Sequence, residues 1–246
     1  MNNRSLAERR TALVFGGSRG IGAAAASRLA ADGFSVALTY VSRPDKATEV
    51  VTSIKAAGGT ALSIKADSAD PTAIRAAAAQ ASEALGQIDV VVVNAGIIRI
   101  APVDAFTLED LDLMLAINVR GVFLAIQAAA SHMREGGRVI TIGSNTAVRT
   151  GTPGASVYAM TKAAVASMVK GIALDLAPRG ITVNNIQPGP TVTDMTADHI
   201  EMIKPLIPLG RAGAPDEIAG LVAYLASKES GYMTGSSLTI DGGMAL

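Results

Sequence analysis

Tyr158 and Lys162 are the two side chains whose types and spacing best suit acid–base chemistry. Residues at positions i and i+4 share one face of a helix, so the phenol and the ammonium group would be neighbours. A free phenol has a pKa of about 10 and transfers protons poorly at neutral pH. A cation about 4 Å away, at an effective dielectric of about 20, would contribute about 4 kcal/mol, or roughly three pKa units. We therefore predict that Lys162 lowers the pKa of Tyr158 and that Tyr158 acts as a general acid and base.

Ser144 lies fourteen residues before this tyrosine, at the end of an apolar run. Substrates of open parallel sheets bind outside the carboxyl ends of the strands, so its hydroxyl would face the substrate crevice. A serine needs a partner base to act as an acyl nucleophile, and the only histidines are His132 and His199. A hydrogen bond to a substrate oxygen is the better interpretation, and capping of the strand end is the alternative.

Glycines follow the first apolar run, residues 11–15, and lead directly into an alanine-rich segment. The loop is Gly16, Gly17, Ser18, Arg19, Gly20, Ile21 and Gly22. Such glycines permit a sharp turn and let backbone N–H groups approach a pyrophosphate at a helix N-terminus. A glycine-rich surface loop is the alternative, but the position after the first strand favours a dinucleotide site.

The end of the second apolar run bears on the choice of dinucleotide. NAD sites place a carboxylate about 20 residues after the loop, on the ribose 2′-hydroxyl. Here the run ends at Tyr40, Ser42 and Arg43 follow, and the first acidic residue is Asp45. Arg19 in the loop can reach the same region. A hydroxyl and two guanidinium groups suit a 2′-phosphate, so we predict NADP(H) in preference to NAD(H); two solvated arginines are the alternative.

Two asparagines complete the predicted site. Asn94, Ala95 and Gly96 end another apolar run with small residues, which would permit close approach of a cofactor ribose. Asn118 lies inside an apolar helical segment, residues 111–130, where an unpaired amide would be costly. A backbone carbonyl or a water could equally satisfy it.

Seven apolar, β-rich runs must position these side chains. They cover residues 11–15, 35–40, 61–65, 88–93, 138–143, 181–186 and 237–240. Most are continuously apolar, as expected of parallel strands covered by helices on both faces. Helix signals lie between them, among them Asp70 before Pro71, a capping box at residues 107–110, and Pro215. The alternation predicts an α/β fold, a single-domain doubly wound parallel sheet of about seven strands with helices on both faces, over residues 1–246.

Composition excludes several classes of function. The 246 residues carry 21 basic and 21 acidic side chains, and 49% are hydrophobic, which fits a globular core. A basic stripe and stacking aromatics are both missing, so we expect no nucleic-acid partner. With no cysteine and two histidines, we expect no metal site. No apolar run approaches the about 20 residues that span a bilayer and no secretory signal is visible, so we expect no membrane contact and a cytoplasmic protein.

In order and spacing, these motifs resemble those of the short-chain dehydrogenase/reductase family, over the whole chain. The resemblance implies a single Rossmann-type domain and reversible hydride transfer between NAD(P)(H) and a carbonyl/alcohol pair. It implies that Tyr158 is the acid–base group and that Lys162 holds the nicotinamide ribose. Ser144 would orient the carbonyl, and Asn118 would hold a water in the proton relay.

The resemblance also implies cofactor contacts beyond the glycine loop. Asp67, next to Ser68, would meet the adenine, and Asn94 and Gly96 would line the ribose. The nicotinamide end would comprise Ile186, Pro188, Gly189, Thr191 and Thr193. The chain departs from the family pattern at Phe15 and Val93, where Thr and Asn are usual. Both changes remove polar groups that would brace the cofactor loop.

Two functions remain open on this scaffold. One is NADPH-dependent reduction of a ketone or aldehyde, similar to that of 3-oxoacyl-carrier-protein reductases. The other is a cyclic-di-GMP-binding regulatory protein, because much of the sequence also resembles a bacterial relative of that kind. The intact Ser144, Tyr158 and Lys162 favour catalysis.

The remaining expectations concern the substrate and assembly. Residues 194–209 are predicted to form a mobile helical lid over a largely apolar pocket for a small-molecule carbonyl or alcohol substrate. The predicted pocket residues are Ile97, Ile98, Thr146, Met195 and His199. Helices at residues 111–132 and 157–177 carry small residues on several faces, and with the family resemblance they predict a homotetramer.

Overall fold

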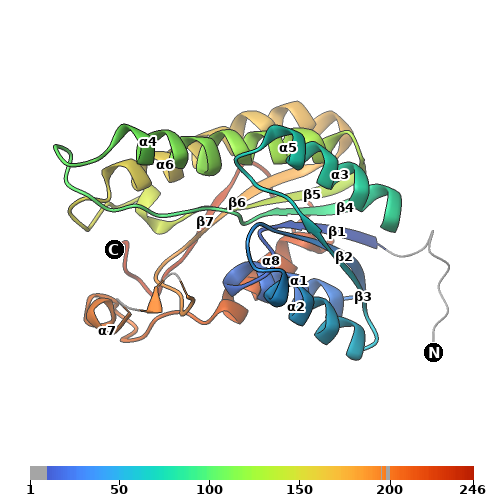
Figure 1. Ribbon diagram of the computed structural model, residues 1–246, viewed down its shortest axis with the longest axis horizontal. Coiled ribbons are helices and arrows are strands. Elements are labelled where there is room, and N and C mark those ends of the chain that lie inside the picture. The colour runs from blue at the N-terminus through green and yellow to red at the C-terminus, as the bar shows by residue number, and fades with distance from the viewer. Residues whose placement is uncertain (1–9, 195, 198–199) are drawn as a thin grey trace.

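The computed structural model describes residues 10–194, 196–197 and 200–246, and its centre is one seven-stranded parallel sheet (Figure 1). The strand order is β3-β2-β1-β4-β5-β6-β7, with every neighbouring pair parallel. The strands are β1 (Arg10–Phe15), β2 (Phe34–Tyr40), β3 (Thr60–Lys65), β4 (Ile88–Val93), β5 (Met133–Ile142), β6 (Thr182–Pro188) and β7 (Ser237–Ile240). Because the order reverses between β1 and β4, their carboxyl ends diverge there and leave a crevice for a ligand.

All seven predicted strands are confirmed; β4 and β7 have the predicted bounds, and the other five differ at one or both ends. The largest difference is in β5, which begins at Met133 rather than Arg138. Its first half contains Arg134, Glu135 and two glycines, so hydropathy gives no strand signal there. Pairing of Met133 with Ile88 of β4 extends the strand all the same.

Helices cover both faces of the sheet, as predicted (Figure 1). One face carries α1 (Gly20–Ala31), α2 (Pro44–Ala56) and α8 (Pro215–Ala226), and the other carries α3 (Pro71–Leu85), α4 (Leu108–Leu115), α5 (Val122–Ala130) and α6 (Ser156–Leu176). Each face has its own buried apolar cluster, with Leu13 and Val91 in one and Val14 and Val92 in the other. Successive strand residues therefore point to opposite faces, which explains the continuously apolar runs.

The predicted helix starts are confirmed by their caps. Asp70 accepts a hydrogen bond from the Thr72 N–H, and Thr107 accepts one from the Asp110 N–H. The expected helix over residues 111–130 differs in its interior. It runs from α4 into α5 through a π-helical turn, Ala116–Gly121, which contains Asn118.

Two helical stretches in the described part of the chain are long and apolar enough, by length and composition alone, to cross a membrane. They are Leu108–Ala130 and Ser156–Arg179, so the expectation that no segment reaches such a length is wrong. Both stretches lie on one face of the sheet, where Ile126, Val165 and Val169 belong to the core. Core helices of α/β proteins pass the same test, and this packing accounts for their apolar character.

Candidate active site

A cavity of about 460 Å³ opens at the carboxyl ends of the strands, around the switch between β1 and β4. Most residues predicted for catalysis or cofactor binding lie in its wall, but Gly17, Gly22 and Asn118 do not. Ile186, also expected near the nicotinamide, is fully buried in the sheet core and is absent from the wall. Topology thus gathers residues from the glycine loop to Thr193 into one crevice.

The glycine loop fits a dinucleotide because its backbone leaves no room for side chains. A Cβ on Gly22 would lie 2.1 Å from the Gly16 carbonyl oxygen. Gly16 itself has φ +73° and faces Ala95, where a Cβ would lie 2.8 Å from the Cα. Helix α1 begins at Gly20, and no side chain of the described residues caps its first turn. Its free N–H groups and positive end suit a pyrophosphate.

Polar groups brace this loop despite the two departures at Phe15 and Val93. Those side chains are buried in the apolar core. Instead, the Thr39 hydroxyl accepts a hydrogen bond from the Gly16 N–H at 2.9 Å, and Asn94 Nδ2 donates to the Gly16 carbonyl at 2.7 Å. Polar groups at Thr39 in β2 and at Asn94, directly after β4, therefore brace the loop although positions 15 and 93 are apolar.

Tyr158, Lys162 and Ser144 share one part of the cavity wall. The Lys162 ammonium lies 5.7 Å from the centre of the Tyr158 ring and donates to the Ile142 carbonyl at 3.0 Å. Ser144 is buried, and its oxygen accepts hydrogen bonds from the N–H and the hydroxyl of Thr146. Its own proton is therefore the one that it donates to Tyr158.

Burial sets the charge state of this pair. It raises the pKa of Tyr158 above its usual 10.0, and a hydrogen bond from Ser144 lowers that pKa only in part. Burial also lowers the pKa of Lys162 to about 8. The predicted net lowering of the Tyr158 pKa is therefore wrong for the protein without cofactor, because burial shifts that pKa upward. The ammonium is held by a β5 carbonyl, and the low dielectric disfavours both charged forms.

The Asn118 side chain makes hydrogen bonds with neighbouring residues and does not line the cavity. Its Oδ1 accepts from the Ile97 N–H at 2.9 Å, and its Nδ2 donates to the Ile97 carbonyl and to the Thr161 hydroxyl. These bonds occupy both the oxygen and the nitrogen of the amide, so the Asn118 side chain is not the group that would hold a relay water. It fixes the chain next to Gly96, where a Cβ would lie 3.4 Å from Asn118 Oδ1 and 3.5 Å from Lys162 Nζ.

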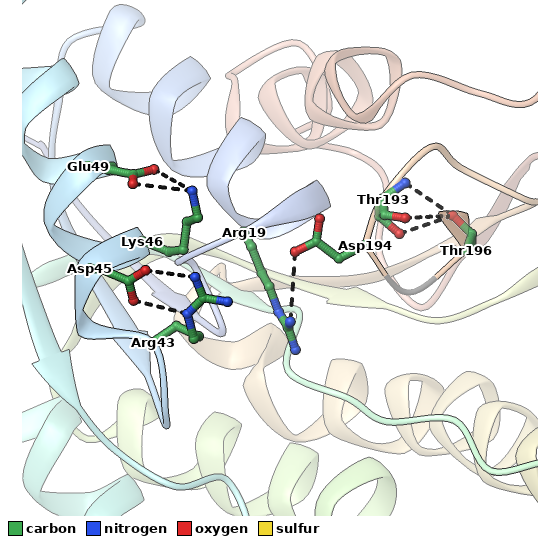
Figure 2. Close-up of polar contacts among 8 residues, drawn as sticks. All are labelled: Arg19, Arg43, Asp45, Lys46, Glu49, Thr193, Asp194 and Thr196. Carbon is green, nitrogen blue, oxygen red and sulfur yellow. Dashed lines mark hydrogen bonds and ion pairs between the residues drawn. The ribbon is translucent and has the colours of Figure 1, made fainter. Parts of the chain in front are cut away.

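The two arginines predicted for a 2′-phosphate line the same end of the cavity, together with Tyr40 and Ser42. Each has a carboxylate beside it (Figure 2). Arg43 makes two hydrogen bonds with Asp45, at 3.0 and 2.7 Å, and Arg19 Nη1 lies 3.8 Å from Asp194 Oδ2. Asp67, at the adenine end, accepts from the Ala69 N–H in a tight turn.

Similarity to known proteins explains why these residues are arranged around one crevice. The family model described as enoyl-(acyl carrier protein) reductase matches residues 16–245. The chain belongs to the short-chain dehydrogenase/reductase family. A short-chain dehydrogenase from Burkholderia cenocepacia, solved in complex with NADP, is 47% identical, covers 96% of this chain and 98% of its own, and has a TM-score of 0.94.

Two curated members of the family are similar over nearly their full lengths. The 3-oxoacyl-[acyl-carrier-protein] reductase of Staphylococcus aureus is 39% identical over 241 residues, which is 96% of this chain and 98% of the relative. The cyclic-di-GMP-binding biofilm dispersal mediator protein of Escherichia coli is 39% identical over 236 residues, covering 95% and 96% respectively. The two resemblances suggested by the motifs, to 3-oxoacyl-carrier-protein reductases and to a cyclic-di-GMP-binding protein, are therefore confirmed.

The substrate end of this family member is only partly as predicted. Ile97 lies in the cavity wall, and Ile98 and Thr146 do not. Met195 and His199 lie outside the described residues. The predicted lid contains a short helix α7 (Ile200–Ile203) and a 3-10 turn (Lys204–Leu206). Its Met202, Leu206 and Leu209 are exposed.

Three threonines with structural roles at the site were missed. Thr39 braces the glycine loop, Thr161 links Asn118 to the Tyr158 carbonyl, and Thr196 closes the turn after β6. Thr39 had a usable signal, since it precedes the end of the second strand, next to the loop. The other two have partners that no local pattern indicates.

Proposed function

We propose that the protein is a carbonyl reductase that uses NADP(H), with Tyr158 as the general acid in the reductive direction. The observation that carries the proposal is the placement of Tyr158, Ser144 and Lys162 in the same wall as the glycine loop. Because burial raises the pKa of Tyr158, the phenol stays protonated at neutral pH and can donate. A bound NADPH would supply the hydride.

In this mechanism the chain's own residues position the carbonyl and move one proton. In the reaction the Ser144 hydroxyl donates a hydrogen bond to the carbonyl oxygen, and the Tyr158 hydroxyl gives that oxygen its proton. Lys162, with a pKa of about 8, is largely charged at neutral pH and stabilises the phenolate left behind. Asn118 is a positioning residue, since it fixes the strand end through Ile97.

The preference for NADP(H) is supported by chemistry and by relatives. Arg19, Ser42 and Arg43 line the end of the cavity that would take the adenosine 2′-phosphate, and no acidic residue ends β2. Structural neighbours that are 38–47% identical are crystallised with NADP or NADPH. A medium-sized hydrophobic ketone or aldehyde, closed in by a lid at residues 194–209, is the substrate class that we propose.

A homotetramer in the cytoplasm belongs to the same proposal. Large apolar side chains are exposed on the helices predicted for the subunit contacts, with Phe123 at 43%, Met160 at 46% and Leu174 at 77% exposure. Such an apolar face suits burial against another copy. Light scattering that gives a stable monomer would remove this part of the proposal.

The test of the activity is Tyr158→Phe, with Tyr224→Phe on α8 as a matched control. Tyr158→Phe should lower kcat by about 10²- to 10⁴-fold while leaving the dissociation constant of NADPH within about twofold. Tyr224→Phe should leave both unchanged. Near-normal turnover of Tyr158→Phe with a panel of ketones would overturn the assignment.

The second candidate is a cyclic-di-GMP-binding protein, on the strength of the Escherichia coli relative. Calorimetric titration with cyclic-di-GMP separates the two. Tight binding, together with no NADPH oxidation by any ketone or aldehyde in the panel, would favour the regulatory protein.

A further inference from the structure

Asp194 places a negative charge at the end of the cavity where the proposed cofactor would place another. We infer that Asp194 competes with the cofactor's 2′-phosphate for Arg19 and thereby limits the selectivity for NADP(H) over NAD(H). The inference rests on the proposed use of NADP(H) and adds a specificity-determining residue to it.

The carboxylate is held near Arg19 by the turn that carries it. The Thr196 hydroxyl accepts from the Thr193 N–H (Figure 2). It also donates to the Thr191 carbonyl, and these bonds close the turn around Asp194. This turn packs on the glycine loop, since a Cβ on Gly20 would lie 3.1 Å from Thr193 Cγ2. The loop and the turn thus bring the guanidinium and the carboxylate to the same mouth of the cavity.

The cations near this end of the cavity are already paired with carboxylates. Arg19, Arg43 and Lys46 form ion pairs with Asp194, Asp45 and Glu49 respectively. The Asp45 carboxylate is the main cause of the raised pKa of Arg43, and Asp194 adds a smaller electrostatic contribution. Asp194 therefore acts on both arginines, and a phosphate with a charge of about −1.5 to −2 would have to replace it beside Arg19.

Geometry identifies Asp194 rather than Asp45 as the competitor. Asp45 is two residues from Arg43 and makes two hydrogen bonds with it, so it orients that guanidinium and moves with it. Asp194 comes from another segment, stands 3.8 Å from Arg19 and has 70% of its side chain exposed. A loose contact of this kind is readily replaced by a phosphate, which forms shorter charge-assisted hydrogen bonds with a guanidinium.

A 2′-hydroxyl meets no such competition. When the ligand lacks the phosphate, Asp194 can remain beside Arg19, and its charge repels nothing on the ribose. Asp194 therefore weakens binding of the phosphorylated cofactor and leaves the other unaffected. Removing its charge should increase selectivity for NADP(H), in contrast to loss of either arginine.

The experiment is calorimetric titration of the full chain with 2′,5′-ADP (adenosine 2′,5′-bisphosphate) and with 5′-AMP, two probes that differ only in the 2′-phosphate. The variant is Asp194→Asn, and the control is Glu83→Gln on α3, an exposed carboxylate that loses the same charge away from the cavity. Asp194→Asn should tighten 2′,5′-ADP by about three- to tenfold and leave 5′-AMP within about twofold. The gain should shrink as salt is raised, and Glu83→Gln should reproduce neither effect.

A double-mutant cycle with Arg19→Gln tests whether the effect acts through Arg19. In that background, Asp194→Asn should change the affinity for 2′,5′-ADP by less than about twofold. Unchanged or weaker binding of 2′,5′-ADP by Asp194→Asn alone, an equal gain for 5′-AMP, or a full gain without Arg19 would each overturn the inference. If the unsubstituted protein binds both probes equally, the proposed use of NADP(H) fails first, and this inference fails with it.

Discussion

Replacing Lys162 by methionine should change how the stability of the cofactor-free protein depends on pH. Lys162 is buried, with 6% exposure, and burial lowers its pKa from 10.5 to about 8. Below about pH 8 the lysine binds a proton in both the folded and the unfolded state. Between about pH 8 and pH 10.5 the folded protein has released that proton while the unfolded chain keeps it. The unfolded state then binds more protons, so the free energy of unfolding rises with pH in this window.

The size of the effect follows from the two pKa values. With 10.5 for the unfolded chain and about 8 for the folded protein, linkage gives a gain of about 2 kcal/mol between about pH 7 and pH 9.5. Tyr158 acts in the opposite direction. Its folded-state pKa is raised above 10.0, so it lowers stability only as pH rises through about 10. Measurements that stop near pH 9.5 therefore report mainly on Lys162.

The assay is urea unfolding of the cofactor-free protein at a series of pH values from about 7 to 9.5. Lys162→Met should lose the rising slope, whatever its stability at neutral pH. Lys170→Met is the matched control, because Lys170 is exposed on the same helix and its loss leaves Lys162 in place. Parallel pH profiles for the unsubstituted protein and Lys162→Met would refute the reasoning, since the buried ammonium would then carry no penalty.

Three further changes test the loop, the brace and the exposed ion pair. Gly22→Ala should weaken NADPH binding more than about tenfold, because its Cβ would lie 2.1 Å from a loop carbonyl, whereas Gly171→Ala, with open space around it, should bind normally in the same titration. Asn118→Ala should lower the free energy of unfolding in urea by about 1–3 kcal/mol, because it leaves a backbone N–H and a carbonyl without their partner; an unchanged midpoint would contradict the bracing role. Arg211 lowers the pKa of Glu217 from 4.5 to about 2, so Glu217→Gln should be less stable than the unsubstituted protein at neutral pH, and acid titration should show the difference vanish between those values.

The fold could be predicted well because its signals are local. A continuously apolar run reports burial of a strand on both faces wherever the strand lies in the sheet, and caps such as Asp70 and Thr107 act within three residues. The prediction was weakest at the start of β5, where Met133 pairs with Ile88 across polar residues and glycines. Strand pairing there depends on a partner 45 residues away in the sequence, and the local hydropathy pattern does not indicate that partner.

The candidate site could be predicted as a set of residues but not as a set of interactions. Spacing identified Tyr158 with Lys162, and topology placed both with the glycine loop in one cavity. Their pKa values did not follow from spacing, because the burial of each group decides them more than the distance between the two. Asn118 was singled out for the right reason, an amide in an apolar helix, yet its role became clear only with its three partners.

The sequence by itself determined the strands, the turns that need glycine, and the helical face shared by a phenol and an amine, because each depends on neighbours within a few residues. The tertiary structure decided which polar groups brace the loop, how far burial opposes charge on Lys162, and which carboxylate faces Arg19. Those properties arise where segments that are distant in the sequence meet in space, as Asp194 and Arg19 do. The local sequence around either residue does not show that the two are close.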